Sequence, residues 1–272
     1  MRKIKDPVKL VFEFILVGIL FFIFYIALSY HNFYEKRADF TAKGTDFSNI
    51  SNFLDITKIK ANIKDAPITV IESNVSEITV SSTVKNRGIG IITSPKAWKS
   101  NGVLHFDQGY VIGHNEKSTG AVTIEVPMGM ILDIDIKSGS GDVTVDISTS
   151  RNVFIDATVG EKTVKSKGDN ILRNSVSGNI NIEDVFENTE IDTVSSDVKM
   201  YADSDTNQIH YKSISGDATI YTQEVRGYNL LHKYSGGKTE KYFEENERYK
   251  AIFDIYADTV DGSIDVIDFN NF

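Results

Sequence analysis

Three aspartates recur at one place in a repeated pattern, and carboxylates are the groups of this chain best suited to bind a cation. Asp142, Asp197 and Asp217 each directly follow a small residue of that pattern. If the copies stacked about 4.8 Å apart, these side chains could bind calcium, because hard cations prefer several carboxylate oxygens. Glu161 and Asn179 occupy the intervening copies. Turn-forming aspartates are therefore the favoured interpretation, and we expect no metal and no cofactor.

No reaction centre stands out elsewhere. The sequence contains no cysteine, which excludes a disulfide framework and a thiol nucleophile. The histidines lack the HxH or HxxxH spacing typical of metal sites, and they are His31, His105, His114, His210 and His232. We expect no catalytic residues and a protein that is not an enzyme. A carbohydrate-active enzyme stays a third interpretation, because polysaccharide lyases use parallel β-helices and a fold alone decides no activity.

The elements that position these residues follow from a repeat of 18 to 20 residues. Each copy has an apolar residue at position zero, a small corner residue at position five, and apolar residues at positions seven and nine. The last interval is longer, 46 residues, so one turn carries an insertion. The corner residues are Gly141, Gly160, Gly178, Ser196, Gly216 and Gly262.

Each copy should form two short strands that meet at the corner. Apolar residues one position apart, such as Val143 and Val145, mark a half-buried strand, because strand side chains alternate between faces. Glycine suits the corner because it adopts positive φ without steric cost. Two copies depart from the pattern, with Lys162 at position seven and Arg173 at position zero.

One such unit cannot bury its apolar face alone, whereas stacked units form a continuous core. The sequence therefore predicts an all-β domain over residues 55–272, as a single-stranded parallel β-helix or solenoid-like stack of about 19-residue rungs. Its first half is less regular. A β-sandwich made of the same strands is the alternative.

The N-terminal region predicts a membrane anchor. Leu10–Tyr30 is almost entirely apolar and long enough to cross the bilayer as one helix. Four lysines and arginines precede it, and only two lie close behind it. The positive-inside rule then places residues 1–9 in the cytoplasm and residues 31–272 outside a bacterial cell membrane, with 31–54 as a linker. A cleaved signal peptide is the alternative.

The charge of the chain restricts its partners. With 29 basic and 38 acidic residues the net charge is −9, and an acidic surface repels phosphate backbones. We expect no nucleic-acid partner. An envelope protein or a glycan is the expected ligand.

The longer turn, residues 222–250, is the predicted place for partner binding, because binding function is often carried on excursions from a regular stack. Its aromatic residues lie among mixed charges and are Tyr228, Tyr234, Tyr242, Phe243 and Tyr249. The alternative is a structural β-hairpin that covers the side or the end of the stack.

The segment VTIEVPMGMILDIDIKSGSGDVTVD, followed by SVSGNINI and SISGDATIY, resembles the bacterial "putative adhesin" domain family of unknown function. The resemblance covers residues 50–272 and implies a β-helix-like extracytoplasmic domain behind a membrane anchor, without catalytic residues. It favours a membrane-anchored interaction module of the cell envelope, as a scaffold or stress-response accessory. The alternative is an adhesin or glycan-binding protein.

Overall fold

The computed structural model describes residues 55–223, 227–234, 239–245 and 252–268, together with Ile19 and short strands at 36–37 and 40–43. Within these ranges the chain is an all-β, solenoid-like stack, as the sequence predicted. The predicted anchor Leu10–Tyr30 lies outside the described residues except for Ile19. Among the residues that are described, no helix has the length and apolar character needed to cross a membrane.

Two sheets face each other along the stack. The first, which we call sheet 1, is parallel from β8 to β20 and ends in an antiparallel pair on each side. In spatial order its strands are β7 (Lys96–Ser100), β8 (Val103–Asp107), β3 (Lys58–Ile63), β11 (Asp133–Ser138), β13 (Asn152–Ala157), β14 (Lys162–Ser177), β16 (Phe186–Ser195), β18 (Gln208–Ser213), β22 (Ile252–Thr259), β20 (Gly227–Tyr234) and β21 (Thr239–Glu245).

The second, sheet 2, contains the partner strand of each rung and is parallel from β10 to β23. Its strands are β2 (Phe40–Lys43), β5 (Thr79–Ser82), β10 (Val122–Pro127), β4 (Ile68–Ser73), β12 (Val143–Thr149), the first part of β14, β15 (Ile180–Ile182), β17 (Val198–Ala202), β19 (Ala218–Thr222) and β23 (Ile264–Asp268). A smaller antiparallel sheet of β1 (Lys36–Arg37), β6 (Lys85–Ile92) and β9 (Val111–Thr119) lies at one end.

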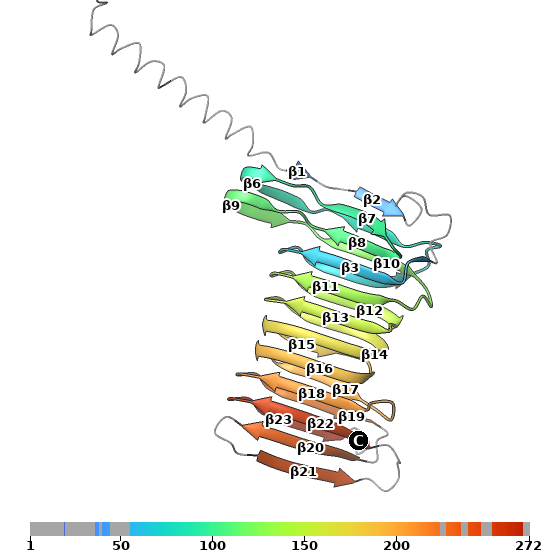
Figure 1. The fold of residues 1–272 in the computed structure, drawn as a ribbon, viewed down its shortest axis with the longest axis vertical. Helices are drawn as coiled ribbons and strands as arrows, with labels where there is room; N and C mark the ends of the chain where they lie inside the picture. The colour runs from blue at the N-terminus through green and yellow to red at the C-terminus, as the bar shows by residue number, and fades with distance from the viewer. Residues whose placement is uncertain are drawn as a thin grey trace, which may run out of the picture.

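Figure 1 shows the layers following one another from β6 and β9 at one end to β21 at the other. From β10 to β19 the chain alternates between the two sheets through the corners. This alternation favours the solenoid-like stack over the β-sandwich, in which hairpins would join neighbours within one sheet. The short strands β1 and β2 belong to the segment predicted as a linker, and they pair with β6 and β5.

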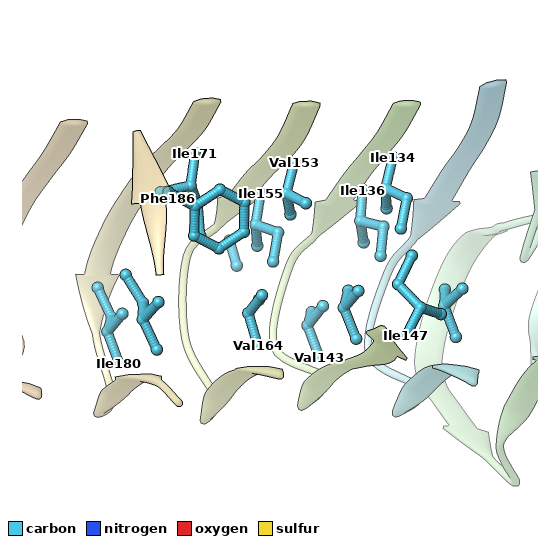
Figure 2. Close-up of a cluster of buried hydrophobic side chains, with 14 of the residues drawn as sticks. Ile134, Ile136, Val143, Ile147, Val153, Ile155, Val164, Ile171, Ile180 and Phe186 are labelled. Atoms are coloured by element: carbon cyan, nitrogen blue, oxygen red, sulfur yellow. The ribbon is translucent and has the colours of Figure 1, made fainter. Parts of the chain in front are cut away.

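The register predicted from the repeat is confirmed. The residues of position zero form one file along sheet 1, from Ile136 through Ile155, Arg173, Ile191 and Tyr211 to Ala257. The residues of position seven form a file along sheet 2, from Val143 through Lys162, Ile180, Val198 and Ala218 to Ile264. Between the sheets these files and their neighbours form the core, part of which Figure 2 shows.

The corners are tight, although the physical reason differs along the stack. Positive φ is found at Gly160 (102°) and Gly178 (94°), as the sequence argument assumed. Gly216 adopts no positive φ, and there the reason is contact, because an added Cβ would lie 2.2 Å from the carbonyl oxygen of Ser196. Positive φ therefore explains only some of the corner positions, and close contact with the neighbouring rung explains others.

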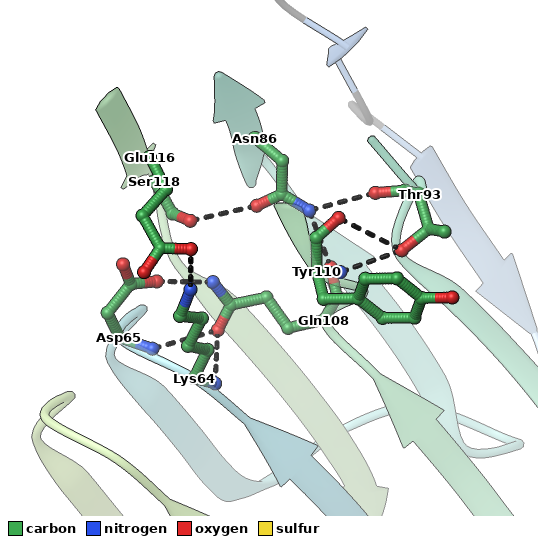
Figure 3. Close-up of polar contacts among 8 residues, drawn as sticks. All are labelled: Lys64, Asp65, Asn86, Thr93, Gln108, Tyr110, Glu116 and Ser118. Atoms are coloured by element: carbon green, nitrogen blue, oxygen red, sulfur yellow. Dashed lines mark hydrogen bonds and ion pairs between the residues drawn. The ribbon is translucent and has the colours of Figure 1, made fainter. Parts of the chain in front are cut away.

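The irregular first half forms an end cap. After β4 the chain leaves the stack and returns as β8 and β10, which pair on the outer side of β3 and β4. Gln108, 1% exposed, fixes this return. Its side-chain oxygen accepts hydrogen bonds from the backbone N–H groups of Lys64, Asp65 and Ala66 at 2.7, 3.1 and 3.2 Å. Figure 3 shows this network without Ala66, and in it Asn86 donates to the Gln108 carbonyl.

The insertion of residues 222–250 forms strands β20 and β21. They pair as an antiparallel hairpin, and β20 also pairs in parallel with β22, so the hairpin extends sheet 1 beyond the last rung. The chain therefore first forms β20 and β21 at the edge of sheet 1 and afterwards inserts β22 between β18 and β20.

Candidate functional site

Outward-facing residues of sheet 1 form columns, because residues in register on parallel strands lie one above another. One column consists of amides. The Asn152 side chain donates to Asp133 at 2.8 Å, Asn170 donates to Asn152 at 2.8 Å, and Asn188 donates to Asn170 at 3.0 Å. Gln208 occupies the next rung in register. Each amide keeps further donor and acceptor capacity for a ligand, since a primary amide has two donors and two lone pairs.

The neighbouring column is rich in aromatic and apolar side chains. The rings of His210 and Tyr256 stack with centroids 4.7 Å apart and planes 25° from parallel. Phe154 is 42% exposed and Tyr256 is 39% exposed, so both rings present surface to solvent. Leu172 follows Phe154 in register, and Glu190 separates Leu172 from His210.

The third column consists mainly of charged residues. Lys137 faces Asp156 at 3.9 Å, and Lys212 faces Asp192 at 4.0 Å. These exposed pairs contribute little to stability because water screens them. Positively and negatively charged side chains therefore both lie beside the aromatic column.

Two adjoining hollows lie over these columns. One, of about 210 Å³, is lined by residues including Glu190, His210 and Tyr256. The other, of about 510 Å³, is lined by residues including Phe154, Asn188 and Glu190. Because Glu190 and His210 line both hollows, the two form one shallow surface along several rungs. We call this surface the outer face of sheet 1.

The outer face of sheet 1 combines flat aromatic surface with hydrogen-bonding groups of both kinds. Exposed rings can pack against the C–H-rich face of another ring. Amides, a carboxylate and an imidazole beside them can bind hydroxyl or amide groups of the same ligand. Noncovalent recognition of a polar, ring-containing ligand is the chemistry that this arrangement supports.

The three aspartates considered as calcium ligands each accept a hydrogen bond from the next rung. The Asp142 carboxylate accepts from the Glu161 N–H at 2.8 Å, and Asp197 accepts from the Asp217 N–H at 3.2 Å. Asp217 accepts from both the N–H and the hydroxyl of Ser263 at 2.8 Å. The hydrogen bonds from Ser263 lower the pKa of Asp217 below its ordinary value. These contacts support the turn-forming interpretation.

Among the residues that the structure describes, no three His, Cys, Asp or Glu side chains gather closely enough to hold a metal ion. Of the five histidines, His210 belongs to the outer face of sheet 1. His105 stacks on Trp98 with ring centroids 4.9 Å apart, farther along the same sheet.

Of the aromatic residues predicted to bind a partner, Tyr228 has a described side-chain environment. Tyr228 is only 6% exposed and packs on Phe253 with centroids 6.1 Å apart, which leaves it little surface for a partner. Tyr234 is in β20, and Tyr242 and Phe243 are in β21. Tyr249 lies outside the described residues.

The outer face of sheet 1 was missed by the sequence reasoning, which followed the inward positions. A signal was present, because asparagines recur at 152, 170 and 188, the same interval of 18 residues that separates neighbouring corners. The pairing of His210 with Tyr256 gave no such signal, since the two residues are 46 positions apart with the insertion between them.

Fold and site together define a β-solenoid-like domain with a polar and aromatic outer face. The sequence profile of the Toastrack DUF4097 family matches residues 56–251, and the chain belongs to this family. This confirms the resemblance to a "putative adhesin" family of unknown function. No curated protein matches the chain.

Several solved structures are similar to the chain at low sequence identity. A "putative cell adhesion protein" from Clostridium sporogenes is 14% identical, with 86% of this chain and 100% of that chain covered and a TM-score of 0.32. A "putative adhesin" from Bacteroides fragilis is 12% identical, with 85% and 97% covered and a TM-score of 0.41. A "putative lipid binding protein" from Parabacteroides distasonis is 11% identical, with 85% and 98% covered and a TM-score of 0.35.

Proposed function

We propose that this protein is a non-enzymatic interaction module of the bacterial cell envelope and that it binds its ligand on the outer face of sheet 1. The stacked pair of His210 and Tyr256 beside the amide column carries this proposal. The polar groups of the face bond mainly to their neighbours within each column, which suits a recognition surface. A hydrolytic site would instead require a nucleophile or a pair of acids aimed at one point.

A glycan is the ligand class that this chemistry favours over a protein partner. The flat face of a pyranose ring presents C–H groups, which pack against exposed aromatic rings. Its hydroxyl groups both donate and accept hydrogen bonds, as do the amides of Asn170 and Asn188. A linear polysaccharide could follow the columns over several rungs, with both hollows as subsites.

Substitution of Tyr256 tests this proposal. We expect Tyr256→Ala in the full-length chain to weaken retention on purified peptidoglycan and other envelope polysaccharides by about fivefold or more, because an aromatic contact is worth about 1 kcal/mol. Binding isotherms on insoluble polysaccharide measure the change. The matched control is Tyr201→Ala, since Tyr201 is 38% exposed and stacks on Tyr221 at 5.2 Å, but on sheet 2. Equal binding by both variants, or no retention of the parent protein, would contradict the proposal.

We also propose the finer features of the fold and its location. The rungs form a single-stranded parallel β-helix, which the parallel register of seven successive rungs from β3 to β22 supports. Leu10–Tyr30 anchors it in the cell membrane, with the N-terminus in the cytoplasm. The apolar length of this segment and its preceding basic residues support the topology.

The absence of native cysteine makes the topology directly testable. A thiol introduced as Lys199→Cys, on the outer side of sheet 2, should react with a membrane-impermeant maleimide on osmotically stabilised cells. A thiol introduced as Lys5→Cys should react only after lysis. The reverse pattern would refute the orientation, and loss of the N-terminal segment from the mature protein would favour the signal-peptide alternative.

A further inference from the structure

Two basic side chains lie inside the stack where the repeat elsewhere places mainly apolar residues. Arg173 occupies position zero in the sheet 1 part of β14, and Lys162 occupies position seven in its sheet 2 part; each is 1% exposed. They approach each other in the core from opposite sheets. The Arg173 Nη1 atom donates to the Lys162 carbonyl oxygen at 3.4 Å.

Only neutral groups accept hydrogen bonds from these two cations within the described part of the chain. Lys162 Nζ donates to the Ser175 hydroxyl and the Ser177 carbonyl, both at 2.6 Å. Arg173 Nε and Nη2 are buried without any partner, and so is the Thr193 hydroxyl. Thr193 lies beside Ser175 in register, and the hydroxyl of Ser213, which follows Thr193 in the same file, is also buried without a partner.

The electrostatics of this cluster call for a negative charge. Burial lowers the pKa of Lys162 to about 8 and that of Arg173 to about 9, and the charge of Arg173 lowers the pKa of Lys162 further. The charge of Asp142, which is exposed at the corner, raises the pKa of Lys162, and this effect is smaller than those of burial and of Arg173. A bound water molecule could accept hydrogen bonds from the orphaned donors, yet it could not balance two buried charges.

We propose that Lys162 and Arg173 form a binding site for a small monovalent anion, such as chloride, enclosed in the core of the stack. The ligand would accept hydrogen bonds from Arg173 Nε and Nη2, with Lys162 Nζ or the Thr193 hydroxyl as a further donor. An anion enclosed by the folded rungs binds the folded state and not the unfolded chain. It therefore acts as a structural ligand, independently of the function proposed for the outer face.

Bromide is the probe that tests this site, because it resembles chloride and can be located by anomalous diffraction. The thermal midpoint of the purified full-length chain is measured in sodium bromide and in sodium gluconate at equal ionic strength. We expect the midpoint to rise with the logarithm of bromide concentration above the dissociation constant. Because the two salts also act on protein surfaces in general, the readout is the difference from Arg173→Met and Lys162→Met. Both variants should lose this specific rise.

Arg151→Met serves as the matched control, since Arg151 is exposed and pairs with Asp133 at 3.6 Å. It should respond to bromide as the parent chain does. Crystals of the parent chain grown in bromide should show anomalous density within hydrogen-bonding distance of Arg173. If the methionine variants do not fold, this anomalous map is the test of the proposed site. A map without bromide there overturns the proposal, as does a bromide response that Arg173→Met retains in full.

Discussion

Lys162 and Arg173 show how a stack can accept long basic residues at interior positions. Their methylene stems can replace the aliphatic contacts of the neighbouring rungs, while the polar heads turn toward hydroxyl and carbonyl groups near the corner. Tyr211 follows the same principle, since its ring fills position zero and its hydroxyl donates to the Gly216 carbonyl at 2.7 Å. Burial raises the pKa of Tyr211, so it stays a neutral donor.

The lowered pKa of Lys162 predicts a specific pH dependence of stability. Below pH 8 both the folded and the unfolded chain carry this proton, and the cost of the buried charge is fully present. Between about pH 8 and 10.5 only the unfolded chain keeps the proton, so the free energy of unfolding should rise with pH. The rise attributable to Lys162 should be at most about 3 kcal/mol in a halide-free buffer.

Chemical denaturation of the parent chain and of Lys162→Met at pH 7, 8, 9 and 10 measures this contribution. The variant should be as stable as the parent at pH 7 or more so, because an apolar residue of similar size replaces a buried charge. Its stability should rise less with pH. Lys199→Met, on the exposed side of sheet 2, is the control and should follow the parent. Parallel pH profiles for the parent and Lys162→Met would show that Lys162 is not desolvated in solution.

At the scale of the element, the corner decides how closely rungs can stack. An added Cβ at Gly178 would lie 2.2 Å from the Gly160 carbonyl oxygen, and at Gly262 it would lie 2.3 Å from the Gly216 carbonyl oxygen. Ser196 carries its Cβ at the same register position and directs its hydroxyl to Ser175 at 3.1 Å. A side chain is thus tolerated where the local backbone provides space for it.

Alanine substitution separates backbone strain from steric contact. Gly178→Ala combines a φ of 94° with the clash, and we expect it to lower the free energy of unfolding by about 3 kcal/mol or more. Gly129→Ala is the matched control, because Gly129 also has positive φ (74°) but has no atom within 4 Å of an added Cβ. It should cost about 1 kcal/mol. Equal losses in urea denaturation would mean that the corner relaxes without difficulty.

At the scale of the whole molecule, excursions of the chain add strands at both ends of the stack. A parallel stack exposes unpaired backbone groups and core side chains at each end, which favours self-association. At one end β7 and β5 pair antiparallel with β8 and β10. At the other end the hairpin of β20 and β21 covers sheet 1 beyond β22, and Tyr228 adds its ring to the core.

Deletion of residues 224–248 tests the capping role of the hairpin. Loss of β20 would expose the edge of β22 and the ring of Phe253. We expect the thermal midpoint to fall by about 10 °C and the protein to self-associate in size-exclusion chromatography. An unchanged midpoint in a monomeric protein that no longer captures a partner would instead support the recognition role predicted from its tyrosines.

The sequence by itself determined the layered fold and its register. The interval between corners and the alternation of inward residues are local patterns, and identical units stack with identical positions in contact. The strand pairing of the first half could not be predicted from the repeat. Strands β8 and β10 lack the corner pattern, and they pair with β3 and β4, from which long segments of the chain separate them.

Only the tertiary structure decided which side chains from distant parts of the chain meet. The asparagine column is the exception, because Asn152, Asn170 and Asn188 recur at the 18-residue interval of the repeat and each rung places them in register. His210 meets Tyr256 because the hairpin between them is displaced beyond β22. Lys162 and Arg173 meet because β14 passes from one sheet into the other. Such contacts depend on nonlocal pairing, which the local periodicity of the chain does not specify.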